Sequence, residues 1–409
     1  MTLLTRRGLM EAGAVGVSTM GSAPAIAAPD PQLNVEIHTP DTLEYLTKDS
    51  EFGTVERGNP LPYKLPEPRL HETGMTRDSW TLEVLPDLAT GTRMQAPMSN
   101  ASGTALTFAA LLKLAETRAV RFLKVITCNN LNAPLGMGLW EGVPLRDVLW
   151  LAKPVSDIRR VIYFGHHNDD PKQMFQGTLP LGRVLEDPPA HNPVILAYKM
   201  NGEWLTGKRG GPVRMIVPEA YGFKSVKWIQ RVVLTNLPGA NDTYADENND
   251  IDSWMKSCAR LLSFPQETKA GATIKVTGVA QVGISGVSKV QYWLQRADAH
   301  NPPGDAYFAQ APWQDAELHT APVGGGWGGG LPAGEMTSGV RGFDASGKPT
   351  EWPQRYTILH WSANIKGVAR GIYTLRCRTI DFSGVAQPMP RPLPKSGMNA
   401  IEEVEIKVT

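Results

Sequence analysis

Residues 194–202, VILAYKMNG, form an apolar run that closes on an asparagine–glycine pair, and the fold of the middle of the chain depends on them. Two related runs follow closely, GPVRMIVP at 211–218 and SVKW at 225–228. A short apolar run bounded by turn residues is typical of a buried strand. We therefore predict strands over Val194–Tyr198, Val213–Val217 and Val226–Leu234.

The same part of the chain carries an excess of positive charge. Between residues 199 and 231 seven lysines and arginines stand against two glutamates, a net +5, whereas the 409-residue chain has a formal net charge of +1. The turn KRGGP at 208–212 lies inside this segment. Glycines let backbone N–H groups approach an anion, and arginine can bind phosphate with two parallel hydrogen bonds. The pattern fits either an anion-binding site or a solvated basic face.

Outside this segment, the N-terminal half mixes short strands with short helices. The expected strands are Trp80–Val84, Phe122–Ile126 and Val161–Phe164, and the expected helices are Ala105–Arg118 and Pro144–Leu151. Residues 28–75 are rich in proline and lack periodicity, so we expect an extended arm that wraps a core. This mixture predicts an α+β fold for residues 28–258.

After about Cys258 the helical patterns stop and β-rich runs separated by turns take over. The expected strands are Thr273–Val279, Val287–Leu294, Tyr356–Ala363, Tyr373–Arg378 and Val404–Val408. Such spacing predicts a separate β-sandwich domain over residues 259–409. The run Gly324–Gly330, with Trp327 at its centre, is interpreted as a flexible loop inserted between two of these strands.

The first 27 residues look like an export signal. Arg6 and Arg7 precede a weakly apolar stretch, and Ala25-Ile26-Ala27 offers small residues for cleavage. This arrangement predicts a twin-arginine signal peptide and a periplasmic protein exported in its folded form; an ordinary basic N-terminus is the alternative. Elsewhere no apolar run reaches the ~18 residues of a membrane span. The near-neutral charge argues against nucleic acid as a partner, and 42% apolar residues exclude a disordered chain.

Cys128 is the strongest candidate for chemistry. It follows the apolar run 122–126 and enters an asparagine-rich loop. A thiolate there can bind a soft metal or act as a nucleophile, while a buried structural cysteine is the alternative. Three cysteines cannot build a disulfide scaffold, and no Cys/His spacing typical of zinc or covalent haem occurs.

Arg57 and the pair His166–His167 are weaker candidates for functional residues. Arg57 lies in the proline-rich arm, where a lone arginine is usually exposed. His166 and His167 follow the predicted strand 161–164, and adjacent residues of a strand point to opposite faces. A shared metal is therefore disfavoured, and a polar loop at the strand end is the preferred interpretation.

Taken together, these segments resemble the sulfite oxidase family of molybdopterin enzymes. The run 194–228 is similar to the family's "LLAYxMNG…GxPxRxVVP…VKW" block, and Cys128 followed by WEGVPLRDVL at 140–149 is similar to its cysteine and "WxGVxLxDVL" motif. The resemblance covers most of residues 50–236. More weakly, the β-rich tail resembles the family's immunoglobulin-like dimerisation domain, which implies a homodimer.

The resemblance also assigns roles to residues. Cys128 would be the protein's thiolate ligand to molybdenum, and Arg57 would bind an anionic substrate. The pyranopterin and its phosphate would be held by Asn59, Asp169, Arg209, Arg214, Ser225, Val226 and Lys227. His167 is an alternative to Asp169. The family's active-site tyrosine has no clear counterpart, since Tyr244 lies too early and Asp250 or Asp252 occupies the expected stretch.

The activity that the resemblance implies is a periplasmic molybdenum-cofactor oxidoreductase acting on sulfite or a related small sulfur compound. Because the chain has no haem motif, its electrons would pass to a separate carrier such as cytochrome c. The sequence departs from the family after Cys128, where Asn129-Asn130-Leu131-Asn132 supplies no arginine. Two alternatives therefore stay open: a reductase of sulfoxides or other oxidised groups, and a non-catalytic periplasmic binding protein.

Overall fold

The structure is a computed structural model of the chain. It describes residues 34–36, 44–131, 133–155, 157–167, 174–188, 191–239, 242–243, 252, 254–301, 304–305, 307–322, 326–331, 336, 339–388 and 397–409. The expected signal peptide, Asp169, Tyr244 and Asp250 lie outside these residues. No helix of the described part is both long and apolar enough to cross a membrane.

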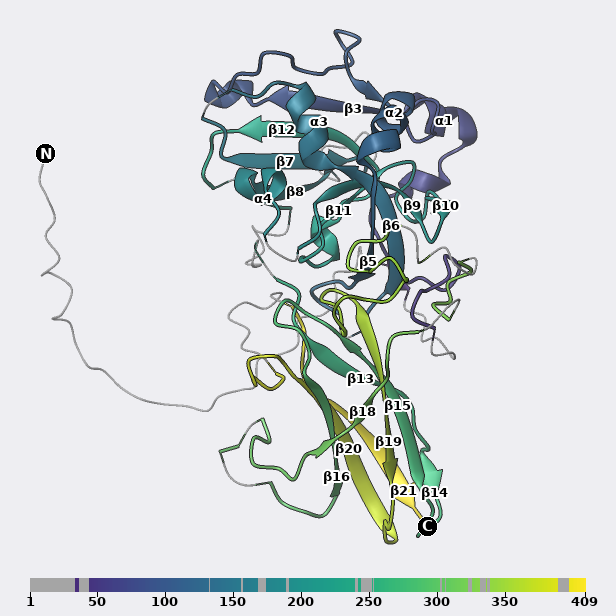
Figure 1. The fold of residues 1–409 in the computed structure, drawn as a ribbon. Helices are drawn as coiled ribbons and strands as arrows, with labels where there is room; N and C mark the ends of the chain where they lie inside the picture. The colour runs from purple at the N-terminus through teal and green to yellow at the C-terminus, as the bar shows by residue number, and fades with distance from the viewer. Residues whose placement is uncertain are drawn as a thin grey trace, which may run out of the picture.

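The first part of the chain contains two five-stranded sheets (Figure 1). One has the order β10 (Glu203–Trp204), β9 (Ile195–Met200), β6 (Gly136–Pro144), β5 (Val120–Ile126), with β11 (Arg214–Ile216) also paired to β9. The other has the order β4 (Leu106–Thr107), β3 (Thr81–Pro86), β12 (Ile229–Thr235), β7 (Arg160–Gly165), β8 (Phe175–Pro180). Apart from β12 with β3, all of these pairs are antiparallel.

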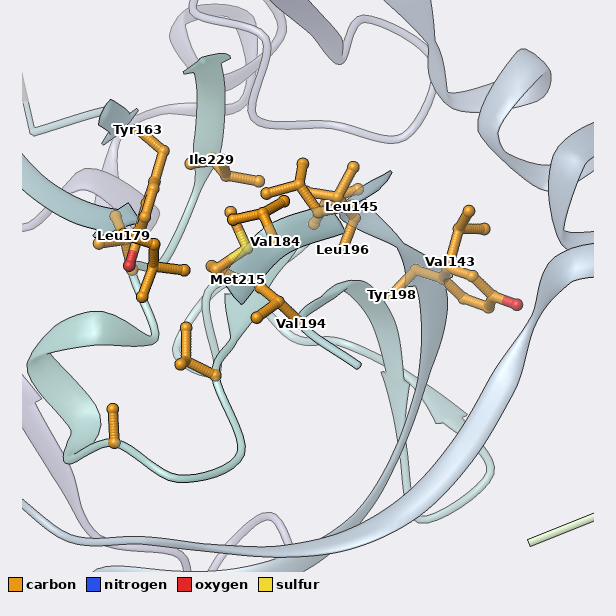
Figure 2. Close-up of a cluster of buried hydrophobic side chains, with 14 of the residues drawn as sticks. Val143, Leu145, Tyr163, Leu179, Val184, Val194, Leu196, Tyr198, Met215 and Ile229 are labelled. Carbon is orange, nitrogen blue, oxygen red and sulfur yellow. The ribbon is translucent and has the colours of Figure 1, made fainter. Parts of the chain in front are cut away.

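The helices are few and short: α1 (Glu67–Glu72), α2 (Phe108–Arg118), α3 (Leu145–Leu151) and α4 (Leu181–Leu185). Helix α2 begins where the Thr107 hydroxyl accepts a hydrogen bond from the Ala110 N–H at 3.2 Å, a typical N-cap. The sheets and helices share one apolar core, in which Val143, Leu145, Leu196 and Met215 pack with side chains of the second sheet (Figure 2). The first part is therefore a sheet-rich α+β fold.

The second part forms two sheets with their own core between them. Their orders are β13 (Cys258–Ser263), β15 (Ile274–Gln281), β19 (Ile358–Ile365), β18 (Glu317–Leu318), and β14 (Glu267–Thr268), β21 (Glu402–Val408), β20 (Gly371–Ile380), β16 (Lys289–Arg296), β17 (Gln314–Asp315). Trp361 of one sheet and Leu375 of the other are completely buried in that core. The immunoglobulin-like character of this part stays a prediction.

All the expected strands and both expected helices are confirmed, with ends shifted by a few residues. Strand β6 is not among the expected strands, and its glycines are depleted in strands generally. Those glycines instead allow close packing: a Cβ on Gly142 would lie 2.4 Å from the Leu196 carbonyl oxygen of the paired strand β9. Helix α1 was also missed, inside the arm that looked irregular.

The arm reaches the core as expected. Its strand β2 (Thr54–Glu56) pairs with β1 (Asn34–Glu36). The Thr47 N–H donates to the Met137 carbonyl at 2.8 Å, and the Gly53 N–H donates to the Leu135 carbonyl at 2.7 Å. These bonds lay the arm along β6, beside the loop that carries Cys128.

The glycine-rich run between β18 and β19 differs from the expected flexible loop in its described part, residues 326–331. Trp327 is only 2% exposed and belongs to the core of the first part. Its carbonyl accepts a hydrogen bond from the Leu46 N–H at 2.7 Å. The packing of the buried indole outweighs the conformational freedom of the surrounding glycines. This segment therefore connects the second part of the chain to the arm.

Candidate functional site

A cavity opens between the arm, the end of β5, the end of β7 and the segment 209–228. It encloses about 100 Å³ and opens to solvent. Its lining consists of Phe52, Gly53, Thr54, Val55, Arg57, Ile126, Cys128, Leu135, His167, Phe175, Arg209, Arg214, Gly222, Phe223, Ser225, Val226, Lys227 and Trp228. Among these described residues four side chains are cationic and none is a carboxylate. The cavity is therefore suited to an anion.

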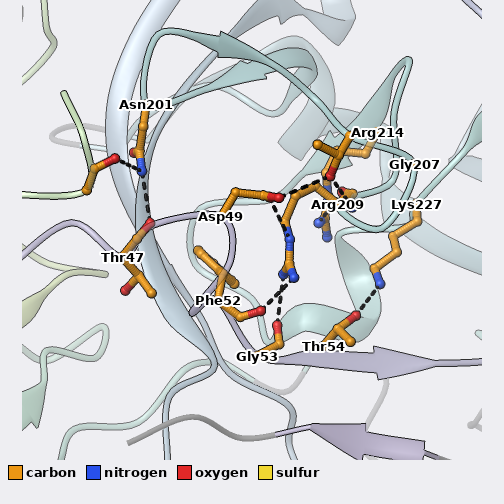
Figure 3. A network of polar contacts seen from close by, with 12 residues as sticks. Thr47, Asp49, Phe52, Gly53, Thr54, Asn201, Gly207, Arg209, Arg214 and Lys227 are labelled. Carbon is orange, nitrogen blue, oxygen red and sulfur yellow. Dashed lines mark hydrogen bonds and ion pairs between the residues drawn. The ribbon is translucent and has the colours of Figure 1, made fainter. Parts of the chain in front are cut away.

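Arg209 lines the cavity and contacts the arm at Asp49, Phe52 and Gly53 (Figure 3). Its Nη1 and Nη2 donate to the carbonyls of Gly53 at 2.9 Å and Phe52 at 2.5 Å. Its Nε forms an ion pair with Asp49 at 3.0 Å, and the guanidinium stacks over the Phe52 ring. Arg209 thus holds the arm in place as well as lining the cavity.

Arg214 and Lys227 bring two more positive charges to the same wall. Arg214 donates from Nη1 to the Arg209 carbonyl at 2.8 Å and from Nη2 to the Ser225 carbonyl at 2.7 Å. Its buried Nε has no hydrogen-bond partner in the described part of the chain. Burial and the neighbouring Arg209 lower the pKa of Arg214 to about 9.

Lys227 is hydrogen-bonded to the arm, and its charged neighbours disfavour its protonated form. Its Nζ donates to the Thr54 hydroxyl at 2.7 Å and lies 3.4 Å from the Val55 carbonyl oxygen. Burial, Arg214 and Arg209 together lower the pKa of Lys227 well below its usual value. Cations that depress one another's pKa would gain most from a bound anion.

Gly210 permits this arrangement of charges. Its φ is +93°, and a Cβ added there would lie 2.7 Å from the Cβ of Lys227. Its carbonyl accepts a hydrogen bond from the Trp228 N–H at 3.0 Å. The left-handed turn therefore fixes Lys227 and Trp228 against the cavity.

Cys128 lies where strand β5 ends, at the wall of the cavity. The side chain is 8% exposed, and its Sγ is 3.8 Å from Asn129 Oδ1. The Cys128 carbonyl accepts from the Leu131 N–H at 3.2 Å, which turns the following residues away from the strand. A thiol in this position faces the same space as the cations.

His167 lines the cavity, contrary to the polar loop predicted from the residues and in agreement with the resemblance, which offers it as the alternative to Asp169. The side chain is 5% exposed, and Nδ1 lies 3.1 Å from the Gly165 carbonyl oxygen, which turns the ring inward from the end of β7. The ring contacts Trp228 and Phe175. Burial, followed by Arg57, His166 and Lys227, lowers its pKa to about 4. The imidazole is therefore neutral near pH 7.

The structure brings together most of the residues that the sequence singles out. Arg57 lines the cavity, with its guanidinium 5.5 Å from the centre of the Phe175 ring. Asn59 is exposed and does not line the cavity. Asp169, the alternative to His167, lies outside the described residues. Asp252 lines a different cavity beside Glu219 and Trp254.

The low pKa of His167 gives a testable dependence of stability on pH. An unfolded imidazole takes up a proton near pH 6.5 and the folded one only near pH 4, so the unfolded state binds more protons between these values. Stability should therefore fall on acidification, by about 2 kcal/mol from His167 between pH 7 and pH 5. Urea unfolding of wild type and His167→Gln at both pH values measures this.

His300→Gln is the control, since His300 is exposed in the segment after β16. It should leave the pH dependence as in wild type. Equal losses of stability in wild type and in His167→Gln would contradict the buried, neutral imidazole.

Comparisons with known proteins agree with a cofactor-binding cavity. The profile of the oxidoreductase molybdopterin binding domain matches residues 72–243. The NADPH nitrate reductase of Aspergillus niger is 36% identical over 124 residues, which are 30% of this chain and 14% of that protein. Mitochondrial sulfite oxidase of Drosophila melanogaster is 36% identical over 116 residues, which are 28% of this chain and 19% of that protein. The chain thus spans less than a fifth of each of these relatives.

A likeness of fold extends further along the chain. The crystal structure of the sulfane dehydrogenase SoxCD from Paracoccus pantotrophus aligns with 81% of this chain and 76% of that chain, with a TM-score of 0.55. The sequence identity in this alignment is 16%. It therefore supports a common fold and leaves the chemistry to be argued from the cavity.

Proposed function

Because this chain belongs to the sulfite oxidase family of molybdopterin-binding oxidoreductases, we propose that it oxidises sulfite or a related small sulfur compound. Its cofactor is molybdenum bound to molybdopterin. The observation that carries the proposal is the joint lining of one cavity by the Cys128 thiol and four cationic side chains, with no carboxylate among the described lining residues.

The residues present fit this cofactor. A thiolate is a soft ligand suited to the metal, and the cofactor's phosphate is an anion that needs paired donors when buried. Arg214 offers a buried Nε without a partner in the described part of the chain. Cys128 would hold the metal, and Arg214, Lys227 and the Ser225–Val226 segment would hold the pterin and its phosphate.

When bound, the cofactor supplies two-electron oxygen-atom transfer chemistry. The chain's own residues bind and orient the reactants. Arg57, half-buried at the mouth, would bind a substrate anion through charge-assisted hydrogen bonds. His167, neutral near pH 7, would add a hydrogen-bonding group without adding charge.

The electrons would leave for a separate carrier, and cytochrome c is the proposed partner because the chain has no haem-attachment motif. The 36% identity to the mitochondrial sulfite oxidase of Drosophila melanogaster, over 28% of this chain, supports a sulfur substrate. The twin arginines at positions 6 and 7 support a periplasmic location. The resemblance of the tail supports a homodimer. A non-catalytic binding protein is set aside, because the family consists of oxidoreductases.

A reductase of sulfoxides is the second candidate. The loop after Cys128 supplies asparagines and no arginine, which leaves fewer charges for a small oxyanion. Turnover of the loaded enzyme with sulfite, thiosulfate and methionine sulfoxide separates the two. Oxidation of sulfite or thiosulfate with reduction of cytochrome c supports the first proposal, and turnover of methionine sulfoxide alone contradicts it.

Arg57→Met should raise KM for an anionic substrate about 10- to 100-fold with an unchanged cofactor content, because it removes a charged hydrogen-bond donor from the mouth of the cavity. Steady-state kinetics and a pterin assay on the same preparation measure both quantities. Arg57→Lys keeps the charge, so its KM should lie between those of wild type and Arg57→Met. An unchanged KM in Arg57→Met would remove this residue from substrate binding.

A further inference from the structure

Both residues next to Cys128 in the sequence form hydrogen bonds with the second part of the chain. On one side, the Thr127 hydroxyl donates to Gln281 Oε1, at the end of strand β15. On the other side, the Asn129 carbonyl accepts a hydrogen bond from the Met398 N–H at 3.0 Å. The segment that carries the thiol is therefore held from outside its own domain.

The contact through Gln281 is buried and uses both ends of the amide. Thr127 is 2% exposed and Gln281 is 1% exposed. The Gln281 Nε2 donates to the Lys256 carbonyl at 2.7 Å, so the amide cannot turn over without losing a bond. The Thr127 carbonyl meanwhile accepts from the Gly222 N–H at 2.8 Å, on the cavity wall. Thr127 thus links the second part of the chain to the cavity.

The contact through Met398 depends on a close approach. The preceding Gly397 has φ +96°, and a Cβ there would lie 2.3 Å from the Tyr221 hydroxyl oxygen. The same hydroxyl accepts from the Lys256 N–H at 3.2 Å, beside the Gln281 contact. Two separate segments of the second part therefore converge on the residues around Cys128.

We propose that Gln281 and the segment 397–398 are positioning elements of the metal site, which hold the Cys128 loop in the geometry that faces the cavity. This extends the proposed function, because it assigns part of the catalytic centre to the β-rich half of the chain. It also predicts that the loop opens when that contact is lost, whether or not cofactor is present.

The test uses the full chain produced without cofactor and follows alkylation of Cys128 by iodoacetamide, with peptide mass spectrometry. Gln281→Leu and Thr127→Val should each speed the reaction of Cys128 about 3- to 10-fold, as expected for a local opening held by one hydrogen bond. The double variant should react no faster than Gln281→Leu alone, because the bond that Thr127→Val removes is already lost in Gln281→Leu. Thr127→Ser keeps the hydroxyl and should react like wild type.

Cys258 and Cys377, both buried in the second part, serve as internal controls and should stay protected. Gln295→Leu is the matched variant: its side chain bonds Arg376, Ala299 and Asn301, away from the Cys128 loop. It should leave Cys128 as slow as in wild type. Gly397→Ala should speed the reaction of Cys128 independently of Gln281.

Unchanged alkylation of Cys128 in both Thr127→Val and Gln281→Leu would overturn the proposal. If Gln281→Leu exposes all three thiols at once, that variant has unfolded, and Thr127→Val decides. Since the readout needs neither metal nor substrate, it stands apart from the proposed activity. In the loaded enzyme, a lower molybdenum content in Thr127→Val that Thr127→Ser restores is the second measurement.

Discussion

Replacing Cys128 with serine should abolish molybdenum-dependent turnover while leaving the chain folded. The thiol faces the cavity at the end of β5 and makes a long polar contact with Asn129 at 3.8 Å. A serine hydroxyl fits this space, but it is a harder and far less acidic ligand than a thiol. Changes to residues that merely support a metal ligand cost about 10- to 100-fold, so loss of the ligand should cost more than ~100-fold.

The measurement pairs turnover with molybdenum analysis of the same purified protein. Cys258→Ser is the matched control, because Cys258 is as well buried but lies in β13 of the second part, and it should keep its metal and its turnover. Thermal unfolding should show Cys128→Ser folded. Full turnover in Cys128→Ser would remove the residue from the mechanism.

The residues that line the cavity could be predicted from the sequence where they lie in continuous motifs. Arg214, Ser225 and Lys227 come from one stretch, 211–228, and strand β11 and the segment just before β12 bring them to one wall. Cys128 could be placed because a strand end that enters a loop delivers a side chain to a sheet edge. Local patterns of this kind survive folding, since each depends on residues close together in the chain.

Other parts of the site depend on contacts that no local pattern encodes. The residues around His167 predict a polar loop, and only the resemblance offers it as an alternative to Asp169; its bond to the Gly165 carbonyl turns the ring toward the cavity. Arg209 looked free to bind a ligand, yet the carbonyls of Phe52 and Gly53 take its donors. Both outcomes depend on how the arm and strand β7 pack.

The link between Cys128 and the second part is the clearest example. Thr127 and Gln281 are 154 residues apart, and neither lies in a motif. Strand β6 is a second example. Its glycines are unusual in a strand, but they are required because strand β9 approaches closely. Contacts between segments that are far apart in the sequence therefore limit what could be predicted from it.

Lys227→Met should weaken retention of the molybdopterin cofactor by about 30-fold or more. Loss of one partner from a buried, hydrogen-bonded charge pair costs roughly 2–5 kcal/mol, and the cofactor's phosphate would lose an ammonium held at the cavity wall. In the chain without cofactor the same change should be nearly neutral, within about 1 kcal/mol. There, loss of the bond to Thr54 is offset by relief of repulsion from Arg214 and Arg209.

These opposite expectations make the experiment decisive. Pterin released from purified protein and measured by fluorescence gives the cofactor content, and urea unfolding of cofactor-free protein gives the stability. Lys208→Met is the control, because Lys208 belongs to the same basic segment but does not line the cavity, and it should keep nearly all its cofactor. A Lys227→Met protein that retains wild-type cofactor would show that the charges of this wall serve only to hold the arm, since Lys227 and Arg209 both bond it.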